Sequence, residues 1–79
     1  MKEQKIKSDA LILVGNNIRR IRKSKKIKQT ELVRLLDLQG VTITRESLVK
    51  IERGIQHIYA SQLRGIKNAL NTTYDEILK

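Results

Sequence analysis

The 79-residue sequence contains no cysteine, proline, tryptophan or phenylalanine, and it has one histidine, His57. Without cysteine the chain has no disulfide and no thiolate ligand, and one histidine cannot supply a ligand cluster, so we expect no metal site and no cofactor. The longest apolar run covers residues 10–14. It is far shorter than the ~20 residues of a membrane span and the ~7 of a signal-peptide core. We therefore expect a cytoplasmic, unprocessed protein.

Length and active-site chemistry both disfavour an enzyme. A chain of 79 residues forms one small domain, because it buries only a little more than ~60% of its unfolded surface. A substrate-sized cleft would have to be cut from that one core. The sequence also lacks a nucleophile–base pair, since His57 stands alone and the glutamates at positions 31, 46 and 52 are expected to have roles on helix faces. We expect neither catalysis nor a small-molecule substrate.

Negative charge is scarce, since 17 Lys and Arg face 8 Asp and Glu and the net charge is +9. Residues 1–28 hold ten basic and two acidic residues, whereas residues 29–79 hold seven and six. Such a basic surface attracts a polyanion, because each neutralised phosphate releases condensed counterions. Two lone tyrosines disfavour single-stranded nucleic acid, which binds by stacking, and the basic stretch lacks the apolar bulk of a membrane-surface helix. Double-stranded DNA is the simplest expected partner, with solubility alone as the alternative.

What the chain does have is 25 Ile, Leu and Val residues among strong helix formers, which predicts an all-α protein with an aliphatic core. Thr44 is expected to cap a helix that Gly54 ends, and Thr73 with Glu76 predicts a capping box for a last turn. Residues 1–8 are expected to form a flexible basic segment. The spacing of apolar residues places the first four helices at about 9–25, 29–38, 45–53 and 60–71.

Three short patterns follow one another along the chain. Gln29 opens the second expected helix, Thr44-Arg45-Glu46-Ser47 opens the third, and Ile51-Glu52-Arg53-Gly54 closes it. This order resembles the XRE family of helix-turn-helix proteins, the phage repressors and Cro proteins, over roughly residues 14–78. The resemblance implies a compact five-helix, lambda-repressor-like DNA-binding domain at residues 9–79. It also implies a sequence-specific transcriptional regulator, as the repressors are, that binds a palindromic operator as a homodimer.

Some positions depart from the family pattern. The connection between the second and third helices is longer by residues 38–42, and Val33 stands where the family usually has alanine. Lys28 and Tyr59 occupy positions that are usually serine or threonine caps. These differences predict a modestly different crossing of the second and third helices.

In this motif the exposed N-terminal face of the third helix reaches base edges in the major groove. The base-contacting residues would then be Arg45, Glu46, Val49 and Lys50. Arginine and lysine can donate to guanine, glutamate can accept from cytosine, and valine can meet the thymine methyl group. The resemblance assigns phosphate contacts to Gln29, Thr44, Ser47 and Arg53. A merely solvated helix face is the alternative for the four base-contacting residues, and a helix cap is the alternative for Thr44.

The resemblance also implies an ion pair between Arg22, late in the first helix, and Glu52, at the end of the third. Ile18 and Ile21 lie on the same stripe as Arg22 and place it beside the core, where an unpaired charge would be costly. We therefore predict a partly buried, bidentate pair.

A second interpretation is an antitoxin or scaffold of the same fold that binds a protein partner, because fold does not determine function. Such a protein would expose an apolar patch outside the third helix. Residues 10–14 are too apolar for one helix face alone. They are candidates for core, for a dimer surface or for this patch.

Overall fold

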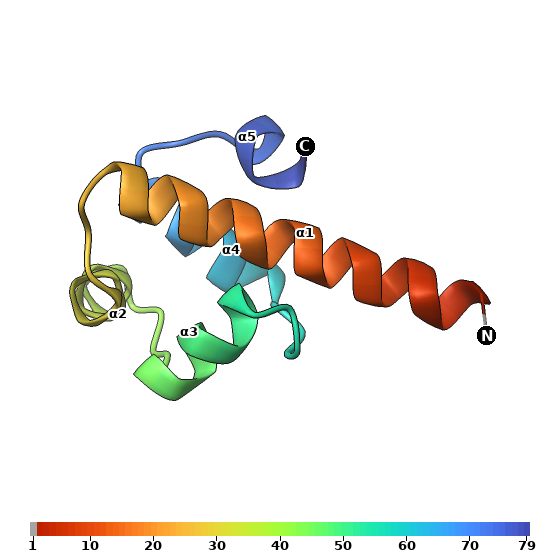
Figure 1. Ribbon diagram of the computed structural model, residues 1–79. Helices are drawn as coiled ribbons and strands as arrows, with labels where there is room; N and C mark the ends of the chain where they lie inside the picture. The colour runs from red at the N-terminus through yellow and green to blue at the C-terminus, as the bar shows by residue number, and fades with distance from the viewer. Residues whose placement is uncertain (1) are drawn as a thin grey trace.

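The computed structural model describes residues 2–79, with side chains from residue 9 onward. These residues form five helices and no strand: α1 Lys2–Ser24, α2 Gln29–Leu38, α3 Arg45–Glu52, α4 Ala60–Ala69 and α5 Tyr74–Leu78. In Figure 1, α5 lies on one side of α1, α2 and α3 lie on the other, and α4 passes behind α1. The predicted all-α class is confirmed. Within residues 2–79, no helix is both long and apolar enough to cross a membrane.

Helix α1 begins earlier than predicted. Ser8 and Asp9 are typical N-cap residues, and the helix was expected to start there, but α1 continues back to Lys2. Lysine, glutamate and glutamine are good helix formers, and residues 2–8 contain no glycine or proline to stop the helix. The domain boundary predicted at residue 9 therefore coincides with no break in the helix. The expectation for Met1 lies outside the described residues.

The core is entirely aliphatic, and every helix contributes to it. Its ten buried residues are Ile18, Ile21, Leu32, Leu36, Ile43, Leu48, Ile51, Ile66, Leu70 and Ile77. Full burial of each such side chain contributes about 1.5–3 kcal/mol relative to exposure. The buried Asn17 side chain donates a 2.8 Å hydrogen bond to the carbonyl of Ile77, which holds α5 against α1.

The predicted helix ends of α3 are confirmed. The Ser47 N–H donates to Thr44 Oγ1 at 3.0 Å, so the threonine caps the first turn. Gly54 follows the last turn with φ of +75°, a left-handed conformation that favours glycine. Its N–H bonds to the Ile51 carbonyl and the Ile55 N–H to the Lys50 carbonyl, which is the Schellman arrangement. These two ends fix the length of α3.

The predicted capping box of α5 is half present. The Glu76 N–H donates to Thr73 Oγ1 at 3.1 Å. The carboxylate of Glu76, however, pairs with Lys79 at 3.2 Å. Thr73 therefore caps α5, and the glutamate serves a surface pair instead of the cap.

The long connection between α2 and α3 is attached to α4. Gln39 Nε2 donates to the carbonyl of Gly65 at 2.9 Å, and Asn68 Nδ2 donates to Gln39 Oε1 at 3.3 Å. A Cβ at Gly65 would lie 2.8 Å from Leu36 Cδ2 and 3.3 Å from Val41 Cγ2, so the absence of a side chain lets both α2 and the connection approach α4 closely. The connection is thereby held in one position ahead of α3.

Candidate nucleic-acid interface

The four predicted base-contacting residues lie together on the outer surface of α3. Arg45, Glu46 and Lys50 are exposed, and Val49 is half-buried. The opposite face of the helix is buried through Leu48 and Ile51. The four residues line one shallow groove of about 200 Å³, together with Arg53 and Ile55. The structure therefore brings these predicted residues into a single surface.

The residues predicted to contact phosphate surround this groove unevenly. Arg53 is exposed and lines it, whereas Ser47 is half-buried and Thr44 is exposed at the start of the helix. The Thr44 hydroxyl accepts the capping hydrogen bond, and its own O–H can still donate to an anion. Thr44 and Arg53 thus lie at opposite ends of α3.

Gln29 has a partner that the sequence did not reveal. Its Nε2 donates to Glu52 Oε1 at 3.1 Å, so its carboxamide joins the Arg22–Glu52 pair. An amide nitrogen carries two N–H groups, and the second can still donate to a phosphate. Gln29 therefore makes a structural contact, and its predicted contact with an anion stays a prediction.

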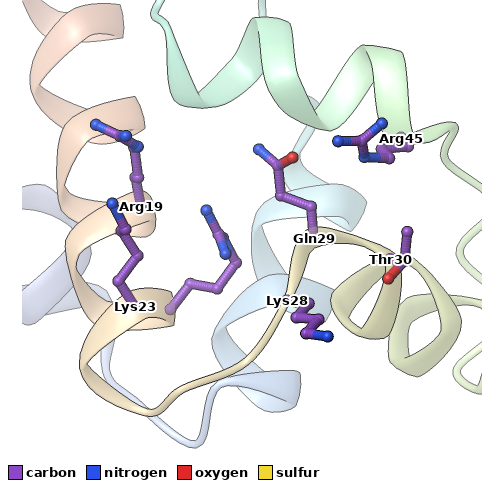
Figure 2. A pocket seen from close by; sticks show the side chains of 7 residues that line it. Arg19, Lys23, Lys28, Gln29, Thr30 and Arg45 are labelled. Carbon is purple, nitrogen blue, oxygen red and sulfur yellow. The ribbon is translucent and has the colours of Figure 1, made fainter.

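A cationic cavity adjoins α3 and extends onto α1. It has a volume of about 430 Å³, and its lining has no acidic residue among the described side chains. Figure 2 shows Arg19 and Lys23 on one side, Arg45 on the other and Gln29 between them. The residues that line the cavity are Arg19, Arg22, Lys23, Lys28, Gln29, Thr30 and Arg45.

Sequence reasoning missed Arg19, Lys23 and Lys28 as members of this surface. Arg19 and Lys23 are four positions apart, so they lie on one face of a helix, and that spacing was visible in the sequence. Lys28 lies just before α2. Its position in space depends on the turn between α1 and α2, and the spacing of residues does not predict the geometry of that turn. These side chains add positive charge where α1, α2 and α3 meet.

The start of α2 lines the same cavity and has open backbone donors. Lys28 stands at the N-cap and makes no side-chain capping bond, and the first N–H bonded within the helix is that of Leu32. In the described part of the chain, the N–H groups of residues 29–31 have no acceptor. Unbonded N–H groups and the helix dipole together favour a bound anion. Glu31 is exposed in the same turn but does not line this cavity.

A buried ion pair fixes α3 against α1. Arg22 Nε lies 2.7 Å from Glu52 Oε2, and Nη2 lies 3.0 Å from Oε1. The two residues are only 8% and 2% exposed. Arg22 Nη1 also donates to the carbonyl of Ile27 at 2.8 Å. The predicted pair is thus present and bidentate, and it is more deeply buried than predicted.

Close backbone packing reinforces this contact. Gly15 of α1 faces the last turn of α3, and a Cβ at this position would overlap the Ile51 carbonyl oxygen and lie 2.8 Å from that of Glu52. Only the absence of a side chain lets the two helices approach this closely. The buried contacts between α1 and α3 therefore fix the orientation of the exposed face of α3.

Comparison of the chain with protein-family models, curated proteins and solved structures finds no match.

Proposed function

We propose that this protein is a sequence-specific DNA-binding transcriptional regulator with a lambda-repressor-like helix-turn-helix domain. One observation carries the proposal: the exposed face of α3 adjoins a cationic cavity that is also lined by the first residues of α2, whose backbone N–H groups have no acceptor in the described structure. An α-helix with its side chains is about 10–12 Å across, and the major groove of B-DNA is about 12 Å wide. Helix α3 would enter that groove.

Base contacts and phosphate contacts would come from different sets of side chains. Arg45 and Lys50 donate to guanine edges, Glu46 accepts from cytosine, and Val49 contacts a thymine methyl group. Phosphates of one strand bind the N-terminus of α2 and the basic side chains of α1. These contacts fix the position of α3 along the duplex without distinguishing one base sequence from another. The cationic residues for this second role are Arg19, Lys23, Lys28 and Arg53.

The proposal includes a homodimer on a palindromic operator, because α3 is short. The helix has eight residues, so one copy can read only a few base pairs. Two copies related by a two-fold axis would double the number of bases read and match an operator with two half-sites. The dimer is part of the proposal.

Duplex binding by charge-matched variants tests the proposal. The double variant Arg45→Ala/Lys50→Ala removes two exposed charges from α3, and Arg34→Ala/Arg64→Ala removes two exposed charges from α2 and α4. In fluorescence anisotropy titrations with a labelled duplex, the affinity of the first variant should fall at least about tenfold, and the affinity of the control should fall less than about threefold. Equal losses would show that charge alone matters, and no duplex binding by the wild type would overturn the proposal.

A further inference from the structure

Apolar side chains gather where α1 extends beyond the rest of the molecule. Ile12 is 44% exposed, and Ile55, just after α3, is 61% exposed. Ala10, Leu11, Val14 and His57 line a groove of about 320 Å³ between α1 and the segment that follows α3. We refer to these six residues, Ala10, Leu11, Ile12, Val14, Ile55 and His57, as the α1 patch.

The two sides of the α1 patch are held together by close packing. Ile12 lies against Gly54, where a Cβ would be 2.6 Å from Ile12 Cα, and Ile55 is the next residue. The backbone of α1 continues past the patch to Lys2 and extends beyond the other helices (Figure 1). No other helix covers this part of α1 in the described structure. A partner could therefore lie along it.

The lack of charged residues at the patch favours a second copy of this chain over an acidic partner. About a third of the chain, 32% of its residues, is charged, yet residues 10–18 and 54–63 contain no Asp, Glu, Lys or Arg. These two uncharged segments are the ones that meet at the patch. Two copies with a charge of +9 repel each other, so they can approach at low cost only where neither presents cationic side chains. An acidic partner would gain more at the cationic surface elsewhere.

We infer that the α1 patch is the surface through which two copies of this chain form a dimer. The role of this dimer in DNA binding rests on the proposed function, because a palindromic operator is bound by two copies side by side. Ile55 also lines the groove of α3 with Arg53, so the uncharged patch ends where the cationic side chains of the proposed DNA surface begin. A copy bound there lies beside α3, and DNA affinity then rises with protein concentration through dimerisation.

Sedimentation equilibrium of the full chain without DNA tests the inference. The double variant Ala10→Gln/Ile12→Gln changes two exposed patch residues, and Leu38→Gln changes a 72% exposed leucine at the end of α2. The wild type and Leu38→Gln should dimerise with similar dissociation constants, and the double variant should weaken dimerisation at least about tenfold. If the double variant fails to melt cooperatively, Ile55→Gln, at a position outside the helices, should give the same loss.

Three results would overturn the inference: a wild type that stays monomeric at about 100 µM, patch variants that dimerise normally, or an equal loss in Leu38→Gln. A monomeric wild type would indicate that a different protein binds the patch. Anisotropy with a half-site duplex separates this inference from the proposed function. A monomer that binds the half-site contradicts only the dimer surface, whereas a dimer that binds no duplex contradicts only the DNA proposal.

Discussion

Arg22 and Glu52 lie 30 positions apart in the chain and meet in a buried ion pair with two hydrogen bonds, of 2.7 and 3.0 Å. The pair joins the last turn of α1 to the last turn of α3. Gln29, the first residue of α2, donates to the same carboxylate. One carboxylate therefore holds together the three helices whose ends form the candidate interface.

Removal of that carboxylate should strongly destabilise the protein. Glu52→Ala leaves the Arg22 guanidinium buried without its partner, which typically costs about 3–5 kcal/mol of the free energy of unfolding. Glu76→Ala is a control because it breaks the exposed pair with Lys79, and it should cost under about 1 kcal/mol. Urea denaturation followed by circular dichroism measures both values.

A double-mutant cycle checks that the pair itself causes this loss. The cycle compares Arg22→Met, Glu52→Leu and the double variant Arg22→Met/Glu52→Leu, which leaves no charge in the buried site. The double variant should lose less free energy of unfolding than the two single variants together, by at least about 1 kcal/mol. Additive losses, or a Glu52→Ala protein as stable as the wild type, would contradict the role given to the pair.

Gly15→Ala should destabilise the protein although alanine favours helix by about 1 kcal/mol over glycine. The new Cβ would overlap the Ile51 carbonyl oxygen, so α1 and α3 would have to separate. Asn16→Ala changes the exposed neighbour in the same helix and should be neutral or slightly stabilising. Thermal melts of the two variants make the comparison. A melting temperature of Gly15→Ala at or above that of Asn16→Ala would show that the helices are not in close contact.

The sequence predicted the elements that depend on short-range patterns, because such patterns carry their own physical cause. Leu48 and Ile51 share a helix face, Thr44 can cap only a helix that begins directly after it, and Gly54 supplies the left-handed conformation of a helix end. The Arg22–Glu52 pair joins distant positions, and it was predicted through the family resemblance together with the place of Arg22 beside the core.

Other features that depend on the meeting of distant segments were not predicted. Gln29 was assigned to phosphate, but its bond to Glu52 arises only when α2 and α3 pack together. The position of Lys28 beside Arg19 likewise depends on the turn between two helices. The start of α1 was misplaced for a local reason, since Ser8 and Asp9 favour helix N-termini but do not prevent a helix from passing through them.

Duplex binding should weaken steeply with salt. If each protomer neutralises about five phosphates, a dimer should give a slope of about −9 in a plot of log binding constant against log salt concentration. Anisotropy titrations at several concentrations of KCl measure this slope. A slope near zero would show that the cationic surface does not contact the DNA backbone.

Base and phosphate contacts should respond differently to mutation. Arg45→Ala or Lys50→Ala should cost about 1–3 kcal/mol on the preferred site and relax the preference at one base position. Lys23→Ala removes a charge from the α1 side of the cationic cavity, and it should weaken binding to preferred and random duplexes by the same factor. Parallel titrations of both duplexes test this division. Equal losses on the two duplexes for all three variants would contradict it.

Selection of bound duplexes from a random-sequence pool tests the central claim most directly. If α3 reads bases in the major groove as a dimer, sequencing should recover a palindromic consensus with half-sites about 10 base pairs apart, or a multiple of that distance. The same selection with Arg45→Ala should lose one position in each half-site. A bound pool without enriched sequence would contradict the account, because binding would then depend on backbone charge alone.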